Sequence, residues 1–309
     1  ASLLRPLLPR AGERARHWPA RHRCLHRRAP LQQLVVLAAA ALPVAAESQL
    51  PRGPEVCHGR KVPPHAFPWL VKVSQEGGSL CTGTLVGPST VLTAAHCVDE
   101  LTRSARAASA CVGGRGGECT LEPAACVHPS WQPDSGHGLD VALLHLSTPS
   151  RTSPIPLISN ETTSLEQVGE PVVLAGFGYE CPGFSEDAHY TDALTVIGRS
   201  SCQRQLNADL HPIQHPWNIS TVELCAQDAA GLSGAAIGDS GGPLFHEMKT
   251  SSGSRYVQVG VVHGGQAEGI GLPDVYTRVL PALAWIHEVV SGHEPPPCKK
   301  LVPPPSVLV

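Results

Sequence analysis

The sequence predicts an all-β fold, and three observations lead to that prediction. Glycine and proline each occur 30 times among 309 residues, which is typical of many turns and short strands. Aromatic residues make up only 4%, so the core must consist mainly of Val, Leu, Ile and Ala. Short apolar segments alternate with turn signals, as half-buried strands do. Examples of these segments are residues 69–73, 82–86, 141–146, 171–175 and 256–262.

One segment, residues 280–290, predicts a helix. Its apolar residues Leu283, Ile286 and Val290 recur at helical spacing. Gly292 suits the C-terminal end, because helices often end at a glycine. The sequence therefore predicts a folded body of strands, residues 56–293, that ends in one α-helix.

The first part of the chain differs from the rest in charge. Residues 1–28 hold eight arginines and one acidic residue. Removing them from the totals of 23 basic and 26 acidic residues leaves the remainder with a net charge of about −10. An acidic body argues against nucleic acid as a partner, because phosphate contacts need clustered Lys and Arg. The basic segment is better explained as part of a targeting signal.

A targeting signal is also indicated by the apolar run at residues 34–42, which ends in small residues up to Ala46. The run is shorter than the ~20 apolar residues that a membrane span needs, so we expect cleavage after Ala46 and secretion. An organelle transit peptide and a signal anchor stay open as alternatives. The chain then divides into a targeting segment (1–46), a short pro-segment (47–55), the body (56–293) and a proline-rich tail (294–309).

Cysteine usage agrees with an oxidising, extracellular compartment. There are 11 cysteines, and cleavage after Ala46 would remove Cys24 and leave an even number. The spacing of Cys and His does not suggest a zinc site, and we expect neither a metal nor a cofactor. Glycosylation sequons begin at Asn160 and Asn218.

Three motifs carry the residue types of nucleophilic catalysis. A serine hydroxyl is a weak nucleophile that needs a base, and histidine, with an ordinary pKa of ~6.5, can take its proton. A carboxylate in an apolar run is costly to bury without a partner such as histidine. A glycine-rich run turns tightly and can aim N–H groups at an oxyanion. The motifs are residues 92–97 (LTAAHC) with His96, 139–144 (LDVALL) with Asp140 and 238–244 (GDSGGPL) with Ser240.

In order and spacing these motifs resemble those of the chymotrypsin/trypsin family of serine proteases, over about residues 56–290. The resemblance implies two antiparallel β-barrels with a C-terminal α-helix and an active site in the cleft between the barrels. It implies a secreted, monomeric serine endopeptidase that acts on protein or peptide substrates through an acyl-enzyme and meets protein inhibitors. The implied site residues are the triad His96, Asp140 and Ser240, the oxyanion-hole N–H groups of Gly238 and Ser240, and the disulfides Cys81–Cys97 and Cys202–Cys225.

The start of the body departs from the family pattern. Family zymogens are cut after Arg or Lys, and the new amine pairs with the aspartate before the nucleophile, here Asp239. The resemblance places Val56 at that start, but Glu55 precedes it. Cleavage after Glu55, cleavage at Arg52 or Arg60, and activity without cleavage all stay open.

The specificity pocket also departs from the pattern. Trypsin-like members carry an aspartate six residues before the nucleophile, where this chain has Gly234. Gly264 replaces the tryptophan of the pocket wall, next to Gly265. Asp274 stands on the opposite wall, where the family usually has glycine, and an acid there would face a basic P1 side chain. A basic P1 preference is therefore slightly favoured over the alternative that Asp274 is a solvated loop residue.

Six cysteines of the body and tail receive no partner from the resemblance. One hypothesis joins Cys57 to Cys181, because both would lie near the activation region. The partners of the other four stay open: Cys111, Cys119, Cys126 and Cys298.

An inactive or zymogen-like homologue that acts as a binding protein is the alternative function. The altered start and pocket favour it, whereas the intact triad and oxyanion glycines favour an enzyme. A lipase or esterase does not fit, because in those enzymes histidine comes last in an α/β chain. Here His96 comes first and Ser240 last, in a β-rich chain.

Overall fold

A computed structural model describes residues 59–300 of the chain, apart from short gaps. The gaps are residues 76–77, 105–107, 115, 122, 134–137, 181–182, 185–186, 209–215, 252, 266–270 and 293–297. The described residues belong to one compact unit. The predicted targeting segment and pro-segment lie outside them, as do Val56 and both cysteines of the hypothetical Cys57–Cys181 bond.

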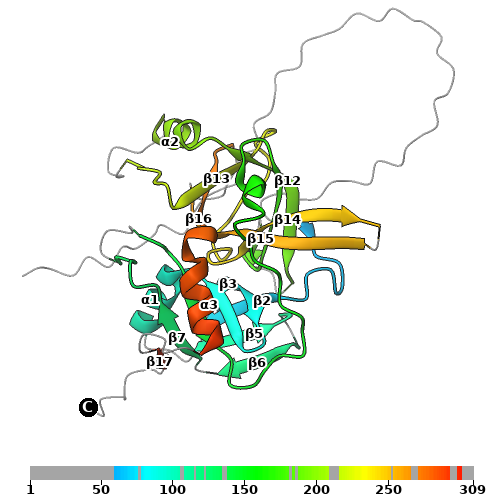
Figure 1. The fold of residues 1–309 in the computed structure, drawn as a ribbon, viewed down its shortest axis with the longest axis vertical. Helices are drawn as coiled ribbons and strands as arrows, with labels where there is room; N and C mark the ends of the chain where they lie inside the picture. Colours follow the sequence, from blue (N-terminus) through cyan, green and yellow to red (C-terminus); the bar gives the residue numbers. More distant parts are fainter. Residues whose placement is uncertain are drawn as a thin grey trace, which may run out of the picture. The chain divides into compact units, whose positions relative to one another are not determined.

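Most of the described secondary structure is β-strand (Figure 1). The strands are β1 (Arg60–Lys61), β2 (Leu70–Gln75), β3 (Gly78–Gly87), β4 (Thr90–Thr93), β5 (Ala108–Val112), β6 (Glu118–Leu121), β7 (Ala124–Val127), β8 (Ala142–His145), β9 (Pro171–Gly176), β10 (Tyr179–Glu180), β11 (Gly183–Phe184), β12 (His189–Ile197), β13 (Glu223–Asp228), β14 (Pro243–Thr250), β15 (Gly253–Gly264), β16 (Asp274–Arg278) and β17 (Lys299–Lys300). The helices are α1 (Ala95–Ser104), α2 (Arg199–Ala208) and α3 (Leu283–Ser291), with 3₁₀ turns η1 (Thr163–Glu166) and η2 (Leu280–Ala282).

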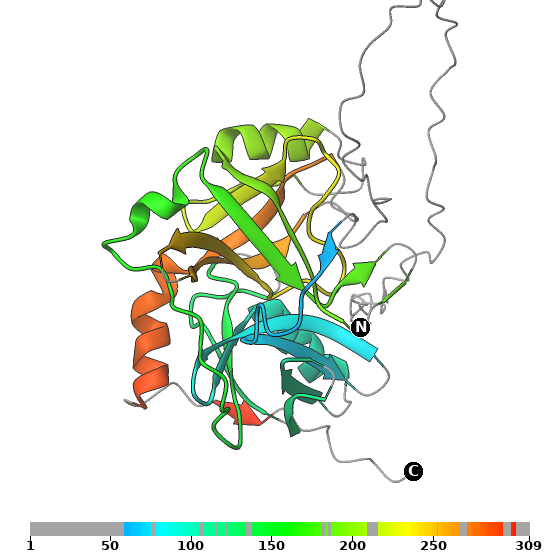
Figure 2. The ribbon, with the colours of Figure 1, turned by 90° about the vertical axis from the view of Figure 1, so that its right-hand side faces the viewer.

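Two large antiparallel sheets form the body (Figure 2). One has the strand order β1-β12-β13-β16-β15-β14-β9, and β12 also pairs with β9, so that six strands close into a barrel. The other has the order β17-β7-β8-β4-β3-β2-β5-β6 and is a curled half-barrel. The prediction of an all-β, two-barrel fold is confirmed, although only the C-terminal barrel closes.

A continuous core of mostly aliphatic side chains joins the two sheets. Alternating residues of β5 point into it, as expected of a strand with one buried face. Phe67 bridges the sheets, since its ring lies 5.8 Å from Trp69 beside β2 and 5.0 Å from Phe245 in β14. This packing fixes the two sheets against each other and therefore fixes the loops that meet between them.

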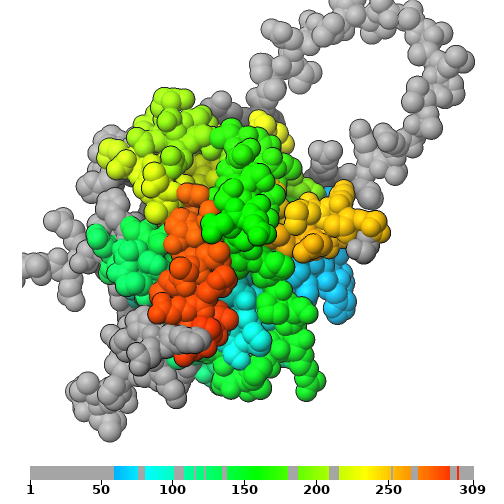
Figure 3. Space-filling model, in the orientation of Figure 1, coloured from blue at the N-terminus to red at the C-terminus, as the bar shows by residue number. Residues whose placement is uncertain are grey.

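The C-terminal helix forms where the sequence predicts it. Its first turn is the 3₁₀ turn η2, and Gly292 ends α3 in the left-handed conformation with φ +72°. In Figure 3, α3 lies on the surface beside the segment that connects β8 and β9. It buries Trp285, Ile286 and Val289, whereas Val290, expected on the apolar face, is exposed.

Helices α1 and α2 were not predicted from the sequence. In α2 only Cys202 and Leu206 are buried, so its apolar periodicity is weak. A disulfide from Cys202 to Cys225 of β13 ties this polar helix to the C-terminal barrel. Among the described helices, none combines the length and the apolar run that crossing a bilayer requires.

Candidate active site

The three residues of the predicted triad lie in a helix and in loops that border the two sheets. His96 is the second residue of α1, and Asp140 lies just before β8. Ser240 lies in the loop between β13 and β14, and its carbonyl oxygen accepts a hydrogen bond from Thr82 N of β3 at 2.8 Å. The Cys81–Cys97 disulfide joins the neighbours of Thr82 and His96. The fold therefore brings the Ser240 loop against the segment that carries His96.

Asp140 is buried and holds His96 by two hydrogen bonds. Its Oδ1 accepts the backbone N–H of His96 at 2.9 Å, and its Oδ2 lies 2.6 Å from His96 Nδ1. Burial alone would raise the pKa of Asp140, but hydrogen bonds from His263 and His96 outweigh it and hold the pKa well below the ordinary value. Asp140 is therefore ionised, and because His96 Nδ1 faces this carboxylate, Nε2 is the ring nitrogen that points away from it.

A second histidine also contacts Asp140, and the sequence analysis missed it. His263 Nδ1, at the end of β15, lies 2.6 Å from the same Oδ2 atom. The only signal in the sequence is a histidine in the run Val262-His263-Gly264-Gly265, a run that the family resemblance links to the pocket wall. Asp140 is thus placed between two imidazole rings.

The loop before Ser240 exposes backbone N–H groups as an oxyanion hole requires. Ile237 O accepts the N–H of Tyr179 at 2.7 Å. This carbonyl and the N–H of Gly238 belong to the same peptide group, and a trans peptide points its C=O and N–H in opposite directions. The N–H of Gly238 therefore faces away from Tyr179. Gly238 has φ +98°, a conformation that favours glycine. In the described part of the chain, the N–H groups of Gly238 and Ser240 donate to no protein acceptor.

Gly241 allows the Ser240 loop to approach the N-terminal sheet. Its φ is +79°, and a Cβ at this position would lie 2.2 Å from Thr93 Oγ1 and 2.5 Å from Thr82 O. Any larger residue would push the loop away from β3 and β4. The Ser240 side chain is partly buried and makes no direct hydrogen bond to His96 in this conformation.

Asp239 is fully buried beside the nucleophile loop. Its two carboxylate oxygens accept the N–H groups of Gly178 and Ala236, each at 2.9 Å. Burial raises the pKa of Asp239 to about 6, because these backbone bonds only partly offset the lost hydration. Its predicted partner, the amine of Val56, lies outside the described residues.

We expect Asp239→Asn, in the chain before any activation cleavage, to have a free energy of unfolding that increases relative to that of wild type as the pH rises. The folded-state pKa of about 6 exceeds the ordinary 3.8, so the folded state binds more protons and the wild type loses stability between pH 4 and pH 6. The difference in the free energy of unfolding between variant and wild type should grow by about 3 kcal/mol from pH 3.5 to pH 7.5. Urea unfolding at both pH values measures it, and a pH-independent difference would contradict the assignment.

The predicted pocket residues lie close together. Asp274 at the start of β16 is buried, and its Oδ2 accepts the N–H of Ala235, the residue after Gly234, at 2.7 Å. Among the described residues, Asp274 Oδ1 has no hydrogen-bond partner. A Cβ on Gly265 would lie 2.8 Å from this oxygen, so glycine there leaves room beside the buried carboxylate. Burial raises the pKa of Asp274 well above its ordinary value.

Four disulfides are present in the described residues. Two of them are the pairs implied by the resemblance, Cys81–Cys97 and Cys202–Cys225. The other two answer a question that the sequence left open: Cys111–Cys119 joins β5 to β6, and Cys126–Cys298 ties the proline-rich tail to β7. Asn160 and Asn218 of the two sequons are both exposed.

Three clusters of potential metal ligands occur in the part of the chain that the structure describes, and we assign a metal to none of them. Two consist of a histidine beside disulfide-bonded cysteines. The third is His96, Asp140 and His263, whose facing atoms already hydrogen-bond each other.

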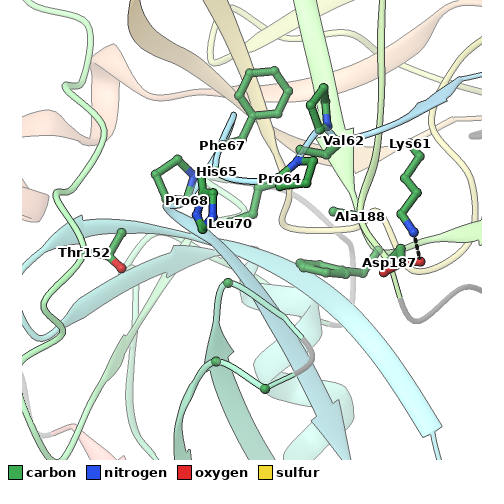
Figure 4. A pocket seen from close by; sticks show the side chains of 15 residues that line it. Lys61, Val62, Pro64, His65, Phe67, Pro68, Leu70, Thr152, Asp187 and Ala188 are labelled. Atoms are coloured by element: carbon green, nitrogen blue, oxygen red, sulfur yellow. Dashed lines mark hydrogen bonds and ion pairs between the residues drawn. The ribbon is translucent and has the colours of Figure 1, made fainter.

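A groove of about 500 Å³ lies apart from the triad (Figure 4). Residues between Lys61 and Leu70 form much of its wall, together with Phe177, and Lys61 forms an ion pair with Asp187 at its rim. His96, Asp140 and Ser240 do not line it, so this groove is not the candidate active site.

This fold, with a closed six-stranded barrel, a curled half-barrel sheet and a short C-terminal helix, defines the class of the trypsin-like serine proteases. The chain belongs to that family, since residues 56–286 match the family model described as Trypsin. It is 34% identical over 266 residues to serine protease 56 of Homo sapiens, covering 79% of this chain and 41% of that protein. It is 30% identical to melanization protease 1 of Drosophila melanogaster (81% and 69% covered) and 29% identical to granzyme M of Homo sapiens (84% and 97% covered). The chain thus spans less than half the length of serine protease 56.

Proposed function

We propose that the chain is a serine endopeptidase whose triad is His96, Asp140 and Ser240. The observation that carries the proposal is the 2.6 Å contact between His96 Nδ1 and the buried, ionised Asp140, because it leaves Nε2 as the basic atom. The Ser240 oxygen attacks the scissile carbonyl while Nε2 takes its proton, and the N–H groups of Gly238 and Ser240 stabilise the oxyanion. Nε2 then protonates the leaving amine, and water hydrolyses the acyl-enzyme.

A basic P1 preference is part of this proposal. Asp274 has one buried oxygen without a hydrogen-bond partner among the described residues, and the missing side chain of Gly265 leaves room beside that oxygen. A Lys or Arg side chain entering this region would supply the missing donor and the compensating charge. Gly234 contributes no charge, so Asp274 would act as the sole acidic anchor among the pocket residues we name.

Secretion is the proposed location. The family and the four disulfides are typical of extracellular proteins. Exposure of Asn160 and Asn218 is compatible with glycosylation at both sequons. Substrates are proteins or peptides, and protein inhibitors are the expected further partners.

The proposal is tested by labelling the purified protein with a fluorophosphonate, which reacts with activated serines. Wild type should be labelled, and Ser240→Ala should lose the label completely because the nucleophile is gone. Ser254→Ala, which changes an exposed serine of β15, is the matched control and should keep the label. Equal labelling of wild type and Ser240→Ala would place the reactive group elsewhere and contradict the proposal.

The zymogen-like binding protein is the second candidate, and one observation favours it. Glu55 precedes Val56, where family zymogens carry the Arg or Lys after which they are cut. A chain that is labelled only after proteolysis frees an amine at Val56 would be a zymogen of the proposed enzyme. A folded chain that is never labelled, with its N-terminus mapped to residue 56, would support the binding role.

A further inference from the structure

The carboxylate of Asp140 receives two imidazole groups on one oxygen atom. His96 Nδ1 and His263 Nδ1 each lie 2.6 Å from Oδ2, and the two rings are 6.2 Å apart between centroids. At this separation from a carboxylate that is ionised, each Nδ1 carries its proton and donates it. The mechanism proposed above uses only the His96 contact, so the His263 contact has no role in it.

His263 is held in a fixed place by its neighbours. It comes from the C-terminal barrel, whereas His96 in α1 and Asp140 just before β8 lie beside the N-terminal sheet. The rings of Trp131 and Trp217 meet it edge-on, with centroids 6.4 and 6.2 Å away. Its side chain is only 16% exposed, so its orientation toward Asp140 is set by packing.

The charged groups around His263 favour its protonated form. Burial alone would lower its pKa, but the hydrogen bond and the charge of Asp140, with a smaller contribution from the charge of Glu223, raise the pKa above the ordinary value. His96 is the other titratable group that faces the same carboxylate. The two histidines therefore compete for the negative charge of Asp140.

We propose that His263 is a positioning residue of the triad, and that its protonation state sets how much of the Asp140 charge supports His96. The proposal rests on the proposed peptidase function for its kinetic consequence. When His263 is neutral, its Nδ1–H orients the carboxylate and leaves the full negative charge for His96. When His263 is protonated, it forms an ion pair with Asp140 and competes with His96.

The kinetic consequence follows from the proton transfer. In the attack step the Ser240 hydroxyl proton moves to His96 Nε2, which makes His96 an imidazolium ion. If His263 is already an imidazolium ion, two cations must share one carboxylate, and their repulsion opposes the step. At the 6.2 Å separation of the two ring centroids, this repulsion should lower the rate roughly ten- to a hundredfold. The active enzyme therefore needs both histidines neutral before substrate reacts, so His263 adds to the loss of activity at low pH.

Two variants separate the hydrogen bond from the charge. His263→Asn keeps a neutral N–H donor at the δ position and cannot be protonated. The comparison is made one pH unit below the pH at which wild-type kcat/KM has fallen to half of its plateau value. At that pH, the fraction of its own plateau kcat/KM that His263→Asn retains should be at least about threefold larger than the fraction that wild type retains. His263→Phe keeps an aromatic ring but removes the donor, and its plateau kcat should fall about tenfold or more with KM nearly unchanged.

The surface variant His287→Asn is the control and should reproduce the wild-type pH profile. An acid limb of His263→Asn that coincides with wild type would overturn the role of the charge. A plateau kcat of His263→Phe equal to that of His263→Asn would overturn the role of the hydrogen bond.

A spectroscopic measurement tests the contact without any need for activity. Imidazole N–H protons bound to a carboxylate resonate far downfield in proton NMR spectra. Ser240→Ala protein should show two such resonances coupled to imidazole nitrogen, and the Ser240→Ala/His263→Asn double variant should show one. A single resonance in Ser240→Ala would overturn the proposal about His263. Two resonances in Ser240→Ala, together with a wild-type protein that no fluorophosphonate labels, would instead count against the peptidase function and leave the contact standing.

Discussion

Asp140→Asn is expected to lower kcat by about 10⁴-fold, the loss typical of this change in serine-protease triads. The amide can no longer accept hydrogen bonds from His96 Nδ1 and His263 Nδ1 on a charged oxygen. His96 then loses the group that fixes its tautomer and stabilises its charged form. The rate of fluorophosphonate labelling measures the effect without any assumption about P1, and turnover of a peptide substrate gives kcat.

Asp192→Asn is the matched control for this prediction. Asp192 is exposed and pairs with Arg60 on the surface, so its loss should leave kcat unchanged within about twofold. Circular dichroism of both variants would verify that each is folded. An Asp140→Asn protein that is folded and retains more than about a tenth of the wild-type labelling rate would contradict the assigned triad.

The second large effect is expected for Asp274→Asn on substrates with Arg or Lys at P1. Removing one partner of a buried ion pair costs about 3–5 kcal/mol, so kcat/KM should fall about 10²- to 10⁴-fold. The change keeps the size of the side chain and the acceptor for the N–H of Ala235. Substrates with a small apolar P1 residue should change by less than about threefold, because they do not use the charge. A panel of fluorogenic peptides that differ only at P1 measures both.

The raised pKa of Asp274 adds a pH test to this prediction. The buried carboxyl is protonated below its raised pKa when no cation is bound, and a cationic ligand must displace that proton. The affinity for benzamidine, a cation that resembles the Arg side chain, should therefore rise with pH in wild type and stay flat in Asp274→Asn. Flat, weak binding in both proteins would show that Asp274 does not face the P1 side chain.

The local motifs allowed much of the fold and site to be predicted from the sequence. The strands at 69–73, 141–146 and 171–175 were recognisable because apolar residues and turn residues alternate within a few positions. The helix near the C-terminus was visible for the same reason, whereas the polar α2 was not. His96, Asp140 and Ser240 stood out because each lies in a short motif with its own chemistry.

Other features depend on contacts between residues far apart in the chain. The pairing of Cys126 with Cys298 spans 172 residues, and no local pattern in either segment indicates the other. The closure of the C-terminal barrel depends on β12 pairing with both β13 and β9. Strand pairing also leaves the N-terminal sheet a half-barrel, and the periodicity of apolar residues does not indicate which strands pair.

The sequence by itself determined the residue types of the chemistry, the order of the motifs, the all-β class and the C-terminal helix, because these are properties of neighbouring residues. Only the tertiary structure placed His263 on the same oxygen of Asp140 as His96, 123 residues away from that aspartate. It likewise showed that Asp274 keeps one buried oxygen unpaired beneath Gly265. Hydrogen bonds and burial of this kind arise when two sheets pack against each other, and the partners in that packing are distant in sequence.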